Sequence, residues 1–211
     1  MKKGDGTIAV SADGATFVWV PEDAPGYVSR DRGRTWSECI GLPAKLRVIA
    51  DRVDPPRFYA LDTAKGTLYA SGDGGASFNV KAAELPTGDG YLRAVPGHAG
   101  HLWIATGKGL FVSTDGGATH QPVAGPQRAH RVGFGMPAGG AAYPVLFLVG
   151  KVGGISGFFR SDDRGISWRR INDDRHQFGE ITSITGDPRI HGRVYLSSRH
   201  RGILLGEPSE N

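Results

Sequence analysis

Residues 67–78 read TLYASGDGGASF, and this stretch decides the fold. Its first four residues are β-prone, as expected of a short strand. The eight residues that follow, 71–78, combine serine, aspartate and glycine, which favour a tight turn. Glycine reaches positive φ without a steric penalty, and the aspartate carboxylate can accept hydrogen bonds from the backbone of its own turn. The stretch therefore predicts a strand that leads into a hairpin turn, after which Phe78 packs against a neighbouring strand.

The same pattern, S-x-D-x-G-x-[ST]-aromatic, occurs four times along the chain, and only His120 departs from it. Its aspartates recur at intervals of 42, 42 and 48 residues. An enzyme needs a catalytic residue at one place, whereas these aspartates occur at the same position of all four boxes. We therefore assign them a structural role in the turn. They are Asp31, Asp73, Asp115 and Asp163.

Each repeat has room for about four short strands, which in the second repeat are expected at 47–51, 57–61, 67–71 and 77–80. Four-stranded units with a period of 40 to 50 residues are typical of β-propeller blades. The sequence therefore predicts an all-β fold, with about four complete four-stranded blades and an incomplete fifth that form part of a larger propeller. We expect a single partial propeller domain over 1–211, with blades at about 1–43, 44–86, 87–127, 128–174 and 175–211.

The composition excludes several other classes of protein. The chain has 211 residues with 33 Gly and 13 Pro spread throughout, which excludes a helical bundle, and it lacks the roughly 20 consecutive apolar residues of a membrane span. The net charge of +4 is dispersed, which does not indicate nucleic-acid binding. A single cysteine, Cys39, excludes a disulfide framework, and we expect no metal and no cofactor. The first residues, MKKGDG, lack the apolar run of a signal peptide.

Several segments, most of them outside the boxes, carry a more specific signal. In order along the chain, they resemble the C-terminal part of glycoside hydrolase family 74, the xyloglucanases and xyloglucan-oligosaccharide cellobiohydrolases. The resemblance covers nearly the whole chain, although residues 197–202 read SSRHRG where the family usually shows Gly-Thr-Asn-Gly-Arg-Gly. The matching segments are IAVSADGAT at 8–16, ADRV at 50–53, AVPG at 94–97, SDD at 161–163, RIND at 170–173 and TGDPRI at 185–190.

This resemblance implies two seven-bladed propellers around a cleft for a xylose-decorated β-1,4-glucan. It also implies inverting hydrolysis by two aspartates, one from each propeller. No segment of this chain matches either catalytic motif, so no catalytic residue is assigned. We expect the chain on its own to bind carbohydrate or to act as a scaffold. The implied partners are plant cell-wall β-glucan or xyloglucan and the missing blades or N-terminal domain of the same enzyme, and the implied location is extracellular.

Ligand contact is expected in the loops on the side of the propeller opposite the boxes. A glucan offers apolar sugar faces and hydroxyl edges, which call for aromatic side chains beside polar ones. Tyr91, His176 and Phe178, with Asp174 in the same loop as the latter two, meet this requirement, although packing or solvated-loop roles are also open to each. The loops are 21–25, 87–91, 151–155, 172–178 and 198–201.

The four tryptophans are expected in the core, Trp36 and Trp168 as box aromatics and Trp19 and Trp103 within strands. Two other functions are open to a protein with these boxes. One is a non-catalytic propeller for protein binding or complex assembly. The other is a sialidase, whose N-terminal Phe-Arg-Ile-Pro motif is absent from this sequence.

Overall fold

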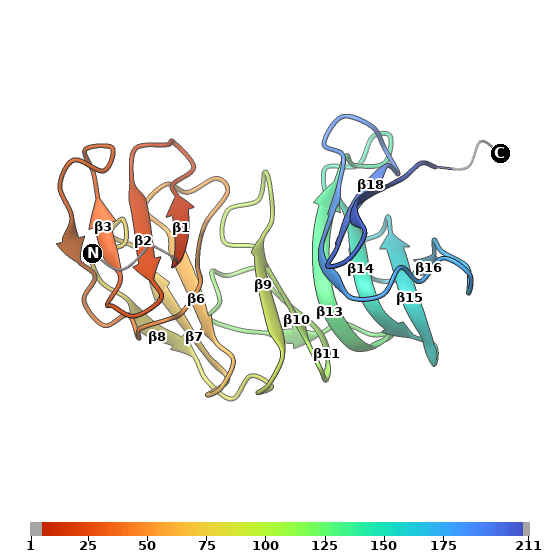
Figure 1. The fold of residues 1–211 in the computed structure, drawn as a ribbon, viewed down its shortest axis with the longest axis horizontal. Coiled ribbons are helices and arrows are strands. Elements are labelled where there is room, and N and C mark those ends of the chain that lie inside the picture. Colours follow the sequence, from red (N-terminus) through yellow and green to blue (C-terminus); the bar gives the residue numbers. More distant parts are fainter. Residues whose placement is uncertain (1–5, 209–211) are drawn as a thin grey trace. The chain divides into compact units, whose positions relative to one another are not determined.

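The computed structural model describes residues 6–208, which form strands, turns and loops, with no α-helix among them. Residues 1–5, which include most of the MKKGDG stretch considered above for a signal peptide, lie outside the described residues. Within the described part of the chain, no helix is long and apolar enough to cross a membrane. The strands form five separate antiparallel sheets (Figure 1).

Each of the first four sheets is a four-stranded meander whose strands follow the order of the sequence. The first contains β1 (Gly6–Val10), β2 (Phe17–Pro21), β3 (Tyr27–Ser29) and β4 (Ser37–Glu38). The second contains β5 (Val48–Ala50), β6 (Phe58–Asp62), β7 (Thr67–Ser71) and β8 (Asn79–Ala82). The third contains β9 (Gly90–Ala94), β10 (Leu102–Thr106), β11 (Gly109–Ser113) and β12 (Gln121–Pro122).

The fourth sheet contains β13 (Pro126–Gly135), β14 (Val145–Val152), β15 (Ile155–Ser161) and β16 (Arg169–Arg170). The fifth has three strands, β17 (Ile181–Gly186), β18 (Val194–Ser198) and β19 (Gly202–Gly206). The predicted fold class, an all-β propeller with four four-stranded blades and a three-stranded fifth, is confirmed. The register of β13 shifts between Pro126 and Arg128 and between Ala129 and Arg131, and these bulges interrupt the alternation of side chains that would mark the start of the strand in the sequence.

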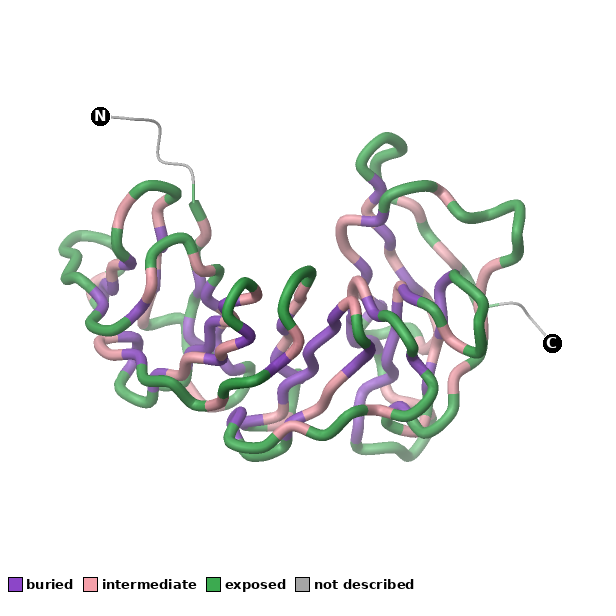
Figure 2. Tube along the Cα trace, turned by 90° about the horizontal axis from the view of Figure 1, so that it is seen from below, coloured by how far each residue is buried: buried purple, intermediate pink, exposed green. Residues whose placement is uncertain are grey.

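The described residues group into two compact units. The first comprises 6–88, 94–102 and 113–120, and the second comprises 89–93, 103–112 and 121–208. In both, buried positions run along the strands and exposed positions concentrate in the connecting loops (Figure 2). The core of the first unit includes Val18, Cys39, Phe58 and Phe78, and a core cluster of the second includes Phe147, Phe158, Ile184, Val194 and Leu196.

The four boxes have the same internal hydrogen bonds. In the second box, the Ser71 hydroxyl donates to Oδ1 of Asp73 at 2.8 Å and accepts the backbone N–H of Gly75 at 2.9 Å. Asp73 also accepts the backbone N–H and the hydroxyl of Ser77, at 3.0 and 2.6 Å. The equivalent hydroxyl at Thr35, Thr119 and Ser167 donates to its own aspartate in the other three boxes. The aspartate of each box thus stabilises the turn that contains it.

The glycine at the fifth position of the box is required both by its backbone and by its surroundings. Gly75 has a φ of +84°, and a Cβ built there would lie 2.5 Å from Cγ2 of Val18. Any larger residue would therefore be strained in its own backbone and would clash with the first sheet.

The tryptophans divide between core and surface. Trp103 is fully buried, and its indole N–H donates to the Tyr143 hydroxyl at 2.9 Å. The prediction for Trp36 is wrong, because 36% of this side chain is exposed and its indole N–H donates to the carbonyl of Gly33 within the turn. A box aromatic is covered by the preceding sheet, and among the described residues no sheet precedes the first one, so Trp36 is not covered. Phe78 of the next box is instead buried between the first and second sheets. Trp19 and Trp168 are half-buried.

A hydrogen bond between an aspartate and a tyrosine links the first two strands of both the second and the fifth sheets. The sequence pattern did not suggest this repeated contact. Asp51 accepts the hydroxyl of Tyr59 at 3.2 Å, and Asp187 accepts that of Tyr195 at 2.9 Å. Both carboxylates are buried and also accept backbone N–H groups of the turn that follows them. The two sheets therefore share the same register between their first and second strands.

Candidate functional site

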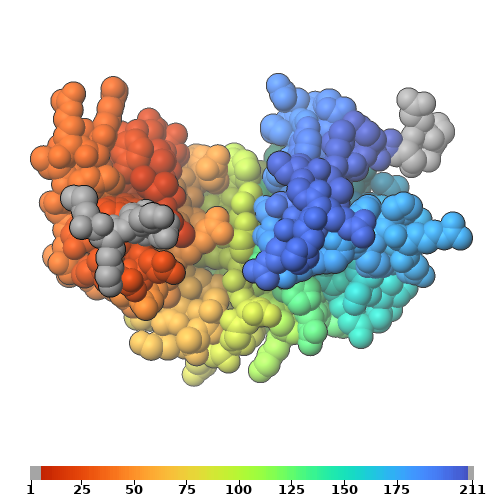
Figure 3. All heavy atoms as spheres, in the orientation of Figure 1, coloured from red at the N-terminus to blue at the C-terminus, as the bar shows by residue number. Residues whose placement is uncertain are grey.

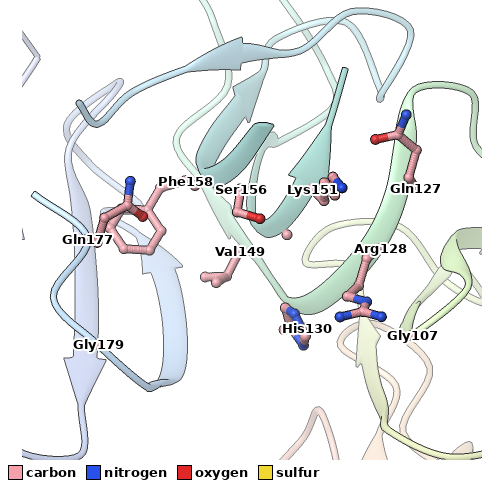
Figure 4. Close-up of a pocket in the computed structure, with 12 residues that line it drawn as sticks. Gly107, Gln127, Arg128, His130, Val149, Lys151, Ser156, Phe158, Gln177 and Gly179 are labelled. Atoms are coloured by element: carbon pink, nitrogen blue, oxygen red, sulfur yellow. The ribbon is translucent and has the colours of Figure 1, made fainter. Parts of the chain in front are cut away.

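A polar pocket of about 470 Å³ lies in the second unit (Figure 4). It is built by the start of β13, the end of β14, the start of β15 and the loop between β16 and β17. Two of the segments that the sequence analysis selected reach it, since Lys151 comes from 151–155 and Gln177 from 172–178. The lining residues are Gly107, Gln127, Arg128, His130, Val149, Gly150, Lys151, Ser156, Gly157, Phe158, Gln177 and Gly179.

The lining offers hydrogen-bonding groups of several kinds and includes no carboxylate. Oε1 of Gln127 accepts the backbone N–H of Gly154 at 2.9 Å, which fixes the orientation of that amide. Burial lowers the pKa of His130, and the nearby Arg128 guanidinium lowers it further, so the imidazole is neutral at pH 7. A neutral imidazole can both donate and accept a hydrogen bond. This set suits a ligand rich in hydroxyl groups.

Tyr91 lies on β9, not in a loop, and is not among the residues that line the pocket. The guanidinium carbon of Arg131 lies 5.0 Å from the centre of its ring, and that of Arg93 lies 6.0 Å away. Arg131 is held in turn by the carbonyls of Thr182 and His130, at 2.8 and 2.7 Å. Tyr91 is therefore part of a packed cation–π group.

The loop at 172–178 divides its side chains between two pockets. Gln177 lines the polar pocket, whereas His176 and Phe178 line a second pocket of about 300 Å³. The Phe178 ring stacks on Phe158 with centroids 6.2 Å apart and planes 4° from parallel. His176 lies 5.7 Å from Phe178 and contacts Oδ1 of Asp173 at 2.6 Å.

Asp174 is exposed and pairs with Arg170 at 2.7 Å. Neither pocket includes it among its lining residues. Of the four candidate sugar-binding residues, the structure thus brings together His176 and Phe178 and places Tyr91 and Asp174 elsewhere. Among the described residues, no group of three or more His, Cys, Asp or Glu side chains is arranged to hold a metal ion.

The sequence analysis missed most of the polar pocket because it looked for aromatic side chains in loops. Gln127, Arg128 and His130 belong to a strand, and Ser156 belongs to the strand two places along in the same sheet. The four polar residues in the segment QRAHR at 127–131, interrupted only by Ala129, are the one signal that could have drawn attention to them. Their convergence depends on strand pairing between segments far apart in the sequence.

Comparison with known proteins gives consistent results. The BNR/Asp-box repeat family matches residues 27–38. A xyloglucanase from Paenibacillus sp is 46% identical over 97% of this chain and 20% of the relative. The xyloglucanase Xgh74A from Acetivibrio thermocellus is 44% identical over 99% of this chain and 25% of the relative. The chain therefore spans between a fifth and a quarter of the length of these curated relatives.

Solved structures agree with the sequence relatives. The crystal structure of the GH74 xyloglucanase from Xanthomonas campestris superimposes with a TM-score of 0.89 at 42% identity, covering 99% of this chain and 31% of that one. The GH74 enzyme from Niastella koreensis gives a TM-score of 0.88 at 37% identity, over 95% of this chain and 30% of that one. The boxes, the five sheets and these similarities agree with one another. The chain therefore carries an Asp-box β-propeller portion of glycoside hydrolase family 74.

Proposed function

We propose that the chain is a glucan-binding and scaffolding part of an enzyme that acts on xyloglucan outside the cell. The observation that carries this proposal is 44 to 46% identity to xyloglucanases over nearly the whole chain. The enzyme would hydrolyse β-1,4-glucosidic bonds with inversion, using aspartates from segments that this chain does not match. Further blades or an N-terminal domain of the same enzyme are the proposed protein partners.

The polar pocket is the proposed site of glucan contact. Its volume of about 470 Å³ is in the range of pockets that hold small ligands, and its side chains can hydrogen-bond to sugar hydroxyls from several directions. Phe158 supplies an apolar surface in the same lining. Because the lining has no carboxylate to serve as acid or base, this pocket is proposed to bind sugar and not to cleave it.

The adjoining loop is proposed to contribute as well. His176 is exposed, so it can reach a sugar that extends beyond the polar pocket. Phe178 stacks on Phe158 and is half-buried, so part of its ring can contact a sugar. Asp174 and Tyr91 would lie at the margins of such a contact surface and not at its centre.

The proposal is tested by affinity electrophoresis in gels that contain xyloglucan, with a plain gel and a mannan gel as controls. The chain should be retarded by xyloglucan alone. Gln177→Ala and Arg128→Ala should weaken the retardation about fivefold, since each loses one or two hydrogen bonds to sugar. Gln121→Ala and Arg169→Ala are matched controls, because both residues are exposed and lie outside the pocket.

Absence of retardation in xyloglucan would contradict the proposal. It would favour the alternative of a non-catalytic Asp-box propeller that binds protein. If the pocket variants and their controls lost the same amount of retardation, the assignment of the polar pocket as the sugar-binding site would be contradicted. Melting temperatures measured on every variant keep loss of folding apart from loss of binding.

A further inference from the structure

A pocket of about 430 Å³, here called the arginine pocket, lies at one end of the first sheet. The turn between β1 and β2 and the box turn between β3 and β4 build it. Both turns lie at the same end of the sheet in Figure 1, and that end is at the surface of the molecule in Figure 3. The lining residues are Asp13, Gly14, Ala15, Arg30, Asp31, Arg32 and Arg34.

The arginine pocket is distinct from the polar pocket. The polar pocket lies at the end of its own sheet where β14 turns into β15, whereas the box of that sheet follows β15 at the other end. The arginine pocket lies at the box end of the first sheet and shares no lining residue with the polar pocket. The role proposed above for the polar pocket therefore leaves the arginine pocket unexplained.

The box turn does not require the three arginines. They occupy the second, fourth and sixth positions of the first box, SRDRGRTW at 29–36. The second box forms the same serine–aspartate hydrogen bonds with small residues at these positions, namely Gly72, Gly74 and Ala76. The guanidinium groups are therefore additions to a turn that is stable without them.

The fourth position of the box has a backbone conformation that favours glycine. Arg32 has a φ of +62°, and the equivalent Gly74 and Gly116 have φ values of +75° and +70°. Arg164 shares this conformation in the fourth box, where its guanidinium carbon lies 4.9 Å from the centre of the Tyr143 ring. Among the described residues, Arg32 has no such partner, so packing within the chain does not explain why an arginine stands there.

Two of the three guanidinium groups are available to a ligand. Arg30 donates from Nη2 to the carbonyl of Asp73 at 2.7 Å, which fixes its side chain beside the next box. The guanidinium groups of Arg32 and Arg34 are exposed, and within the described part of the chain they form no ion pair and no hydrogen bond. They can therefore bind an anion without first breaking a contact.

The two carboxylates of the pocket are held by their own turns. Oδ1 of Asp31 accepts the backbone N–H groups of Arg34 and Thr35, and Oδ2 accepts the Thr35 hydroxyl at 2.6 Å. Oδ1 of Asp13 accepts the Ser11 hydroxyl and the backbone N–H of Ala15. This arrangement leaves Oδ2 of Asp13 as an acceptor for a hydroxyl group.

The balance of charge favours a ligand group with a single negative charge. A hydrogen bond from the Ser11 hydroxyl lowers the pKa of Asp13, and hydrogen bonds from Thr35 lower that of Asp31. Both carboxylates are therefore ionised at pH 7, and with three guanidinium groups the lining carries one net positive charge. A carboxylate matches this charge and the planar shape of a guanidinium, whereas a phosphate dianion would be repelled more strongly by the two aspartates.

We propose that the arginine pocket binds a uronate unit of an acidic polysaccharide. The guanidinium groups of Arg32 and Arg34 bind the sugar carboxylate, and Asp13 accepts a hydrogen bond from a sugar hydroxyl. The pocket has room for a ligand of this size. This contact would give the chain a second attachment, to a charged polysaccharide, in addition to the proposed contact with neutral glucan.

Isothermal titration calorimetry of the whole chain with polygalacturonate tests the proposal, at pH 7 and low ionic strength in calcium-free buffer. Fully methyl-esterified polygalacturonate is the matched polymer, because it has the same backbone without the negative charges. Saturable binding to the charged polymer alone is expected. The proposal is overturned if the charged polymer does not bind or if both polymers bind equally.

Two variants locate the site. Arg32→Gly installs the residue found at this position in the second and third boxes, so it should melt no lower than the parent chain, and it should weaken binding about fivefold or more by removing a charge-assisted hydrogen bond. Arg164→Gly removes the same charge at the same position of the fourth box, outside the arginine pocket, and should leave the affinity within about twofold. Equal weakening by the two variants would indicate general attraction to a basic protein and would overturn the proposal.

Competition distinguishes a sugar carboxylate from a phosphate. Free galacturonate should displace the polymer at lower concentrations than inorganic phosphate at the same ionic strength. The reverse order would assign the pocket to a phosphate-bearing ligand such as nucleic acid and would overturn the proposal. Arg32→Gly should keep its full retardation in xyloglucan gels, so the arginine pocket and the polar pocket are tested separately.

Discussion

The Ser71 hydroxyl and the Asp73 carboxylate are joined by a 2.8 Å hydrogen bond, and both groups bind the backbone of the turn that contains them. The same pair recurs as Ser29 with Asp31, Ser113 with Asp115 and Ser161 with Asp163, at 2.8 Å each time. The serines are almost completely buried, whereas their aspartates lie nearer the surface. The serine therefore connects the turn to the interior of each blade.

Replacing this serine should cost more stability than replacing an exposed one. Ser71→Ala leaves the buried N–H of Gly75 without its acceptor, so we expect a loss of about 1–3 kcal/mol in the free energy of unfolding. Urea denaturation of the variant and the parent chain measures this difference in the free energy of unfolding. Ser37→Ala, at an exposed position in β4, should change stability by less than about 0.5 kcal/mol. A Ser71 variant as stable as the Ser37 variant would refute the structural importance of the box.

The boxes should also make stability depend on pH at acid values. Hydrogen bonds from the Thr35 side chain and backbone lower the pKa of Asp31 to about 2, against an unfolded value near 3.9. Because the folded pKa is the lower one, the contribution is fully present above about pH 4. It is lost as pH falls through about 2. Hydrogen bonds from Thr119 likewise lower the pKa of Asp115.

Asp31→Asn tests this pH dependence. The variant should be less stable than the parent chain at pH 7. The difference should shrink as pH falls from about 4, where the aspartate of the unfolded chain becomes protonated, through about 2, where that of the folded chain does. Thermal unfolding between pH 2 and 7 provides the comparison. A constant difference over this range would mean that ionisation of Asp31 does not contribute to stability.

Phe178 should have two separable roles. Phe178→Ala removes a ring that packs on Phe158 and should destabilise the chain by about 1–3 kcal/mol. Phe178→Leu retains most of the packing, so it should cost less than about 1.5 kcal/mol and yet weaken retardation in xyloglucan gels. Unchanged retardation of the leucine variant would leave Phe178 with a packing role alone.

The 211-residue chain by itself should not hydrolyse xyloglucan at an enzymatic rate. Inversion needs both an acid and a base, and loss of either removes about two to four orders of magnitude in rate. Release of reducing sugar from soluble xyloglucan is the measurement, with a full-length xyloglucanase as the positive control. Turnover above about 1 s⁻¹ would show that this chain holds a catalytic pair.

The sequence determined the repeat and hence the fold class. A turn such as 71–78 is built from contacts within eight residues, so its signal is complete in the local sequence. The strands of the second sheet also lie close to their predicted positions, and β7 spans the predicted residues 67–71. The start of β13 was less predictable, because bulges break the alternation of side chains on which the prediction depends.

Only the tertiary structure decided which residues share a site. The polar pocket joins Gln127 from β13 to Ser156 from β15 and Gln177 from a loop, a set assembled by strand pairing. It likewise decided that Trp36 is exposed while Phe78, at the same position of the next box, is buried. The physical reason is the range of the contacts. The hydrogen bonds of a turn are made within a few residues, whereas a side chain is buried or exposed according to which sheet packs against it.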